Sequence, residues 1–254
     1  MNLKGLPPER FGRLSAWLYG KLAEPALAPF YDAVAAQVEK GLETHLQPGA
    51  PYILDLGAGT SALAVRLARR LPPSSVLALD ESWPMLAKTR PGPPAGKAPW
   101  RLLGRGEKLP LACDGFLLVL STLALHHWEA PGDILAEVFR VLAPGGEFWT
   151  FEPDPESSRE ALRTGLRRLP GPFPPDFLLR RSFRRHGFSQ AEYARLVEPL
   201  VASSPFRRIH QLRSFLWLNW MILRRPGTAQ PPQSVTETGD ASRVAAATKP
   251  VPGT

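Results

Sequence analysis

Two patterns of hydrophobic and polar positions divide the chain. Between residues 9 and 47, apolar side chains recur every three or four positions, which predicts two or three helices broken near Pro25 and Pro29. After that segment, short apolar runs alternate with helical stretches, which predicts βαβ units and a doubly wound, mostly parallel sheet of the α/β class. The expected strands are 52–57, 75–80, 100–104, 115–122 and 146–153, and the helices between them are 61–71, 81–90 and 130–142.

The last part of the chain adds an edge to this sheet. Residues 206–212 and 214–223 are strand-like and separated by one residue, so we expect an antiparallel pair that completes a seven-stranded, Rossmann-like sheet. Three aromatic side chains of this pair are expected in the core: Phe215, Trp217 and Trp220.

We divide the chain into three parts. Residues 1–50 form an N-terminal helical lid, and 51–225 form the main domain with an insertion at 154–205. Residues 226–254 have almost no large apolar side chains and many Pro, Ser, Thr and Gly, so we expect a disordered tail. Within the insertion, Ser189 and Glu192 have the spacing of a capping box, which predicts a helix beginning at residue 190.

Composition narrows the function classes. The chain has 254 residues, of which 44% are hydrophobic, and its single cysteine, Cys113, excludes a disulfide framework and a cysteine-rich zinc site. The longest apolar runs fall short of the ~20 residues that a spanning helix needs. We therefore expect a cytoplasmic protein with no metal and no membrane partner.

The net charge of +8 is concentrated in one segment. Residues 156–225 contain fourteen arginines and five acidic side chains, and the rest of the chain is nearly neutral. This segment either binds an anionic partner or presents solvated helical faces.

A glycine-rich loop predicts a nucleotide-like ligand. Gly57 and Gly59 follow a strand and precede a helix, and Asp80 ends the next strand, where a carboxylate can accept from ribose hydroxyls. With Ala62, the loop also satisfies the dinucleotide fingerprint G-x-G-x-x-A, so an NAD-dependent oxidoreductase is an alternative. Asp55 favours an ammonium over a pyrophosphate, because its negative charge lies just before the glycines.

Five blocks of sequence resemble one family in order and spacing. The chain is similar to the class I S-adenosylmethionine-dependent methyltransferases, especially the small-molecule group that includes ubiquinone and menaquinone methyltransferases. The resemblance runs from about Tyr52 to Pro153 and is carried by ILDLGAGTSALAVRLA, LALDESWPMLAKTR, GRGEKLPL, VLSTLALHHW and EVFRVLAPGGEFWTFEP. It implies S-adenosylmethionine as cofactor and an unidentified small-molecule methyl acceptor.

The resemblance also implies a set of cofactor-binding residues. Asp55 and the backbone of Gly57, Ala58 and Gly59 would hold the methionine end, and Asp80 the ribose. The remaining implied contacts are one adenine wall from Ser82 to Met85, the adenine edge at Gly106 and Glu107, and a floor beneath the sulfur at Ser121.

Three positions depart from the family pattern. Ser61 replaces a third glycine, and we expect it to serve as an unstrained helix N-cap. Arg105 and Leu117 stand where the family commonly has aspartates. Because arginine accepts no hydrogen bond, Glu107 or a backbone carbonyl would have to receive the adenine amino group.

Other side chains could reach a substrate. His126 and His127 follow the fourth strand at the carboxyl edge of the sheet, and we take His126 as a candidate catalytic base beside a structural alternative. Trp83 and Trp128 could stack on adenine or pack as walls. The N-terminal lid contributes three aromatic side chains: Tyr19, Phe30 and Tyr31.

Two alternatives to a small-molecule methyltransferase stay open besides the oxidoreductase. The arginine-rich segment favours an RNA methyltransferase, although STLALHH lacks the Asn/Asp-Pro-Pro-aromatic motif of enzymes that methylate base amino groups. Cys113 follows Ala112 rather than proline, unlike the nucleophile of cytosine methyltransferases. The substitutions at Arg105 and Leu117 favour a non-catalytic cofactor-binding protein.

Overall fold

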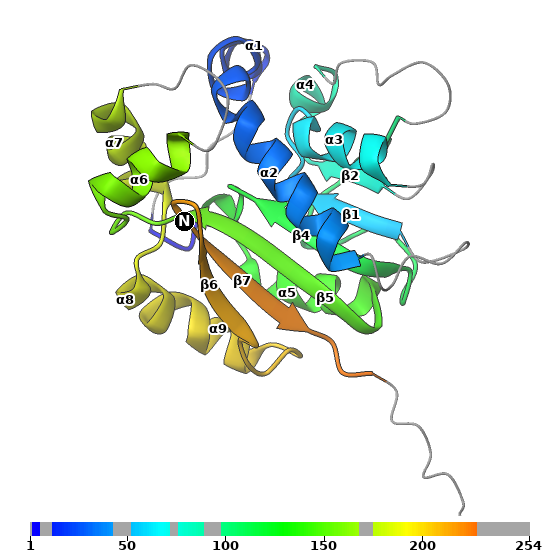
Figure 1. Cartoon of the computed structure of the whole chain (residues 1–254). Helices are drawn as coiled ribbons and strands as arrows, with labels where there is room; N and C mark the ends of the chain where they lie inside the picture. The colour runs from blue at the N-terminus through cyan, green and yellow to red at the C-terminus, as the bar shows by residue number, and fades with distance from the viewer. Residues whose placement is uncertain are drawn as a thin grey trace, which may run out of the picture.

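The computed structural model describes residues 2–5, 12–42, 52–71, 76–88, 98–167 and 175–227 (Figure 1). The predicted tail lies outside the described residues except for its first two positions. Among the described segments, no helix combines the length and the apolar composition needed to cross a bilayer.

A seven-stranded sheet forms the centre of the molecule, as predicted. Its strand order is β3-β2-β1-β4-β5-β7-β6, in which β1 to β5 are parallel and β7 and β6 are antiparallel additions at one edge. The strands are β1 (Tyr52–Leu56), β2 (Val76–Asp80), β3 (Trp100–Leu103), β4 (Phe116–Thr122), β5 (Leu142–Pro153), β6 (Gln211–Phe215) and β7 (Leu218–Arg224). The order reverses between β1 and β4, which is where doubly wound sheets bind ligands.

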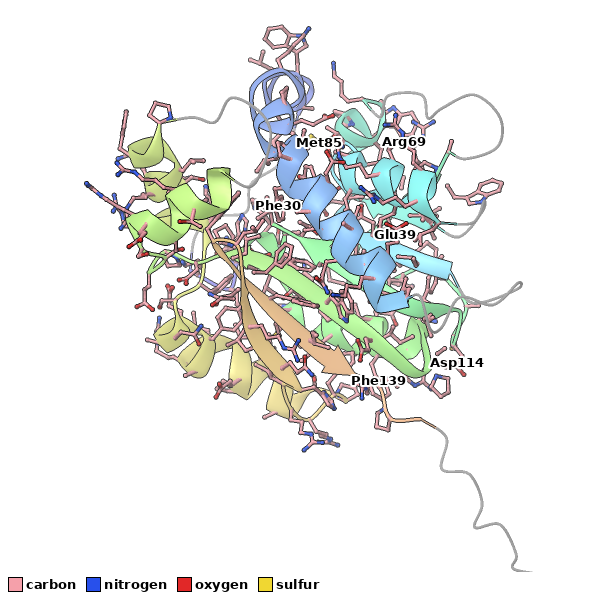
Figure 2. The ribbon with its side chains drawn as sticks, viewed as in Figure 1. Phe30, Glu39, Arg69, Met85, Asp114 and Phe139 are labelled. Atoms are coloured by element: carbon pink, nitrogen blue, oxygen red, sulfur yellow. The ribbon has the colours of Figure 1, made fainter. Side chains whose placement is uncertain are left out.

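Helices cover both faces of the sheet (Figure 1). On one face, α2 (Glu24–Leu42) packs against α3 (Ala62–Arg70), and their apolar side chains join Trp149 and Trp220 in one core cluster. On the other face, α5 (Pro131–Val141) and α9 (Glu198–Ser203) pack over a second cluster. Figure 2 shows Phe30 on α2, within the first of these clusters.

The N-terminal helices differ from the prediction at Pro29. This residue lies inside α2 and does not break it. The irregular turn comes earlier, in the π-helical η1 (Tyr19–Ala23), which follows α1 (Arg13–Leu18). Proline at position 25 lacks the N–H for a helical bond, and the wide π turn directly before it accommodates that loss. The same arrangement recurs at η3 (Tyr193–Val197), which precedes Pro199 in α9.

The insertion carries a helical layer beside the sheet edge. It contains α6 (Arg159–Arg167), α7 (Asp176–His186) and α8 (Gln190–Glu192). The predicted capping box is confirmed, because the Ser189 side chain accepts from the Glu192 amide and the Glu192 side chain accepts from the Ser189 amide.

The edge strands match the prediction with shifted boundaries. β6 begins at Gln211 rather than Phe206, because Arg207 has φ 68° and the chain turns there. Trp217 and Trp220 are buried as predicted, and Phe215 is half-buried.

Candidate functional site

A cavity opens at the carboxyl ends of β1, β2 and β4, at the point where the strand order reverses. Four groups of residues in the sheet domain line it: the loop after β1, the region from Asp80 to α4 (Trp83–Leu86), the loop after β3 at 104–107, and the loop after β4. Tyr19 and Tyr31 contribute from the N-terminal helices. Figure 2 shows Met85, a lining residue of α4, close to these helices.

The loop after β1 has a tight backbone that requires glycine. Gly57 has φ 73°, and a side-chain carbon placed there would lie 2.9 Å from Cβ of Ala124, on the loop after β4. The amides of Gly57 and Ala58 both donate to the carbonyl of Leu79, at 2.9 and 3.0 Å. These contacts hold the loop against β2 and close to the opposite wall.

Ser61 does not behave as the unstrained helix cap that we expected. Its backbone has φ 59° and ψ 25°, and its side chain makes no capping hydrogen bond to α3. The chain needs a left-handed residue to turn from Gly59 into the helix, which is the conformation that glycine adopts most easily. The family's glycine at this position therefore has a backbone role that serine fills with strain.

Two carboxylates with different surroundings line the cavity. Asp55 is 2% exposed, and its Oδ2 accepts no hydrogen bond from the described residues. Burial raises the pKa of Asp55 to about 7, with a smaller contribution from Asp80, although the Ala64 amide acts in the opposite direction. Because this oxygen is buried without a donor, the site fits a ligand that brings an N–H group.

Asp80 stands at the end of β2 and already holds the neighbouring loops. Its Oδ2 accepts from the Gly59 amide and its Oδ1 from the Ser82 amide, both at 2.8 Å. Burial raises the pKa of Asp80, and the two amides lower it. Each oxygen retains a second lone pair, so the carboxylate can also accept from ligand hydroxyls.

Two tyrosines form the side of the cavity that faces the N-terminal helices. The hydroxyls of Tyr19 and Tyr31 lie 3.0 Å apart. Burial raises the pKa of both phenols, so both are neutral near pH 7. The pair therefore offers hydrogen-bonding hydroxyls without adding charge.

The opposite wall is built around Glu152, near the end of β5. Its fully buried carboxylate accepts from the amides of Ala124 and Leu125, at 2.9 and 2.8 Å, and pairs with Nδ1 of His126 at 2.9 Å. His126 is buried and does not line the cavity, whereas His127 does. Burial lowers the pKa of His127 to about 3, and His126 and His186 add to the effect.

The loop after β3 places Arg105 beside two carboxylates. Nε of Arg105 lies 3.4 Å from Oε2 of Glu107 and 3.8 Å from Oε2 of Glu81. Gly106 packs against Ile134, where an added Cβ would lie 3.2 Å from its Cγ1. Arg105 therefore balances carboxylates at the rim of the cavity instead of accepting from a ligand.

Most residues implied by the resemblance gather at this cavity. The lining includes Asp55, Gly57, Ala58, Gly59, Asp80, Ser82, Met85, Gly106 and Glu107. Ser121 is fully buried in β4 outside the lining. Trp128 lines the cavity, whereas Trp83 is 62% exposed and does not.

Sequence reasoning assigned no role to Glu152. The signal was a single acidic residue in the otherwise apolar run FWTFEP, which should have indicated a buried carboxylate with several partners. Its partners, however, lie 26 to 28 residues away in sequence and could not be identified from spacing.

Comparison with known families agrees with the fold. The model of a methyltransferase domain matches residues 54–150, the segment that carries β1 to β5 up to Thr150. The matched residues, 54–150, form a methyltransferase domain. The cofactor of this family is S-adenosylmethionine.

Curated methyltransferases are also similar to this chain, but each match covers only part of the two proteins compared. The chain is 35% identical over 152 residues to a malonyl-[acyl-carrier protein] O-methyltransferase of Methylococcus capsulatus, covering 58% of this chain and 55% of the relative. It is 34% identical over 99 residues to a ubiquinone/menaquinone biosynthesis C-methyltransferase of Desulfotalea psychrophila, covering 39% and 40%. The chain spans about half the length, or less, of such relatives.

Solved structures support the fold of the methyltransferase domain. A SAM-dependent methyltransferase from Aquifex aeolicus has a TM-score of 0.59 and 18% identity, covering 85% of this chain and 99% of that one. A proposed S-adenosyl-L-methionine-dependent methyltransferase from Methanococcus maripaludis has a TM-score of 0.64 and 19% identity, covering 90% and 100%. Within the described part of the chain, no group of three or more His, Cys, Asp or Glu side chains is arranged to hold a metal ion.

Proposed function

We propose that the protein transfers a methyl group from S-adenosylmethionine, bound in this cavity, to a small-molecule acceptor. The observation that carries the proposal is the buried Oδ2 of Asp55, which lines the cavity and accepts no hydrogen bond from the described residues. A cofactor with an ammonium group would satisfy this oxygen. A pyrophosphate beside the same carboxylate would be repelled, which argues against NAD.

We assign the other contacts among the residues that line the cavity. Asp80 would accept from the ribose hydroxyls while keeping its two backbone donors. Ser82, Met85, Gly106 and Glu107 would border the adenine, and the backbone from Gly57 to Gly59 would face the methionine end. Ser121 would support the wall from behind, because it is fully buried and directly precedes Thr122 and Leu123, which line the cavity.

Little acid–base chemistry is required of the protein. S-adenosylmethionine, when bound, supplies a methyl group on a positively charged sulfur, which is a good leaving group. The chain's contribution is alignment of the acceptor and exclusion of water, by Tyr19 and Tyr31 on one side and by Leu123 and His127 on the other. His127 stays uncharged near neutral pH, so it would contact the acceptor as a neutral hydrogen-bonding group. The buried His126 would act behind it rather than as a base on the acceptor.

The acceptor that we favour carries a carboxylate. This choice follows the chemistry named for the Methylococcus capsulatus relative and is supported by the exposed arginines of the insertion. Arg159 on α6 and Arg181 and Arg184 on α7 are exposed, and α7 ends beside the histidines of the cavity wall. Arginine pairs with carboxylates in a two-bonded geometry, so these helices suit an anionic substrate or its carrier.

Calorimetric titration of the purified protein tests the proposal. We expect S-adenosylmethionine and S-adenosylhomocysteine to bind with micromolar dissociation constants and NAD not to bind. Binding of NAD alone would favour the oxidoreductase. If no cofactor binds, Arg105 and Leu117 mark a lost cofactor site, and the methyltransferase proposal fails. Cofactor binding without turnover of any carboxylate-bearing acceptor would overturn the choice of acceptor only.

An RNA-binding measurement on the same purified protein tests the alternative of an RNA methyltransferase. The arginine-rich segment would bind it through phosphates, with affinity that falls steeply as salt rises. We expect no saturable RNA binding at physiological salt, because the described arginines are spread over helices, the edge strands and turns, and the domain matches small-molecule families.

A further inference from the structure

Three histidines from two distant segments meet at the cavity wall. His126 and His127 belong to η2 (Leu125–His127), and His186 is the last residue of α7. The ring centroid of His126 lies 4.0 Å from that of His127 and 4.8 Å from that of His186, and the His127 and His186 centroids are 6.2 Å apart. We call these residues the histidine cluster.

Glu152, on β5, determines which ring nitrogen of His126 donates a hydrogen bond. One carboxylate oxygen accepts two backbone amides of the loop after β4, and the other pairs with Nδ1 of His126. Because a carboxylate oxygen accepts, Nδ1 of His126 donates to Glu152, and in the Nδ1–H tautomer Nε2 carries the lone pair. Among the described residues, Glu152 is thus the link between β5, the backbone of the cavity wall and the imidazole of His126.

The end of α7 is fixed to the same strand. The amide of Phe188 donates to the carbonyl of Pro153 at 3.0 Å, and Gly187 packs so closely that an added Cβ would lie 2.1 Å from that oxygen. Phe183, one turn before His186, is buried in the core cluster that contains α2. The arginine-rich helix therefore ends directly beside Glu152, with His186 against His126.

We propose that Glu152 is a positioning residue that holds His126 in its Nδ1–H tautomer, so that the histidine cluster fastens α7 to the cavity wall. The wall in question is the stretch of Leu123, Ala124 and His127 that lines the cavity. Fastening α7 there aligns the arginine-rich helices with the place where an acceptor would enter. This part of the inference rests on the proposed function, whereas the tautomer and the docking of α7 do not.

Charge in the cluster would oppose this docking. Three imidazoles at these distances repel one another when they are protonated, and burial already lowers the pKa of His127. The Glu152 carboxylate binds the Nδ1 proton of His126, so this proton does not face the other two rings. Without the carboxylate, α7 should detach from the cavity wall before the sheet unfolds.

Glu152→Gln should change the tautomer of His126 while it keeps the backbone contacts of the cavity wall. The glutamine oxygen still accepts from the backbone amides, but its NH2 group faces Nδ1 of His126 and selects the opposite tautomer. We expect nitrogen NMR of histidine-labelled protein to assign Nδ1–H to His126 in the wild type and Nε2–H in Glu152→Gln. An unchanged tautomer in the variant, or Nε2–H in the wild type, would overturn the proposal.

Trypsin reports the docking of α7, because this helix contains Arg180, Arg181, Arg184 and Arg185. We expect cleavage within α7 to be about tenfold faster in both Glu152→Gln and His186→Ala, corresponding to about 1.4 kcal/mol of lost docking. His210→Ala is the matched control, since His210 accepts a backbone hydrogen bond from Arg224 away from the cluster, and we expect wild-type cleavage.

The His186→Ala arm keeps the test decisive if Glu152→Gln does not fold. Wild-type cleavage of α7 in His186→Ala would refute the fastening of α7 by the cluster. S-adenosylhomocysteine should slow cleavage of wild-type α7 and protect the His186→Ala variant less. If the wild type binds no cofactor, the proposed function fails, while the tautomer and cleavage rates still decide the proposal about Glu152.

Discussion

The two walls of the cavity use carboxylates in opposite ways. On the β1–β2 side, Asp55 lines the cavity and has a buried oxygen with no hydrogen-bond donor among the described residues, and Asp80 keeps lone pairs beside two backbone amides. On the β4–β5 side, Glu152 is fully buried, and its two oxygens accept hydrogen bonds from two backbone amides and one imidazole. The first wall is therefore built to bind a ligand, and the second is built to hold its own shape. Substitutions should separate these roles.

Glu152→Ala should have the largest effect on stability. It leaves two backbone amides and one imidazole N–H buried without an acceptor; because costs within one network are not additive, we expect the loss typical of a broken buried pair, about 3–5 kcal/mol in the free energy of unfolding. Urea denaturation followed by circular dichroism measures it. Glu147→Ala on the same strand is the matched control, because Glu147 bonds Trp149 and Arg224 near the surface, and it should cost about 1 kcal/mol. Equal losses would remove the contrast between the walls.

Asp80→Ala should affect binding more than folding. A charged acceptor for ribose hydroxyls is worth about 1.5–3 kcal/mol, so the dissociation constant for S-adenosylmethionine should rise more than about tenfold. The variant also loses the acceptor for Gly59 and Ser82, at a cost of about 1–2 kcal/mol in unfolding free energy, less than for Glu152→Ala. Calorimetry measures the affinity, and unchanged affinity would contradict the placement of the ribose.

Asp55 and His127, one on each wall, should change the free energy of unfolding with pH in opposite directions. The pKa of Asp55 rises from 3.8 to about 7, so the folded state binds more protons between these values and stability falls as pH rises. The pKa of His127 falls from 6.5 to about 3, so the unfolded state binds more protons and stability rises with pH across that window. Each slope is about 1.4 kcal/mol per pH unit, and the two nearly cancel.

Substituting one of the two residues should reveal the pH dependence that the other gives to the unfolding free energy. In Asp55→Asn, the unfolding free energy should rise with pH between about 3 and 6.5, as the lowered pKa of His127 dictates. In His127→Gln, it should fall between 3.8 and about 7. Denaturant midpoints measured across this range decide the matter. Slopes of the same sign in both variants would show that the two walls do not differ in this way.

Trp83→Ala should have the smallest effect. Its side chain is 62% exposed and does not line the cavity, so cofactor affinity should change less than about twofold. Trp128→Phe is the comparison, because Trp128 lines the cavity and is buried. A larger loss of affinity in Trp83→Ala would indicate that Trp83 closes over the bound adenine.

The binding wall was predictable from sequence because its determinants are local. Gly57 and Gly59 lie in a strand–loop–helix unit, and Asp80 ends the next strand, so the parallel topology alone brings them together. The antiparallel edge pair followed from strand-like composition and a short connection. Ser61 was misjudged because the side chain suggested a cap, whereas the backbone conformation decides that position.

The shape-holding wall was not predictable in the same way. Glu152 meets the loop after β4 only because β5 pairs with β4, and His186 reaches His126 only because the insertion returns to the end of β5. Pairs separated by 26 to 60 residues leave no periodic signal in a single sequence. Pro29 was a different error, since a proline was taken as a helix end where α2 continues through it.

A crystal structure with S-adenosylhomocysteine tests the central claim most directly. The account predicts the amino group of the ligand within hydrogen-bond distance of Oδ2 of Asp55 and the ribose hydroxyls on the carboxylate of Asp80. It also predicts that Glu152 keeps its three contacts in the complex. A nucleoside bound elsewhere, or an Asp55 oxygen still without a donor, would contradict it.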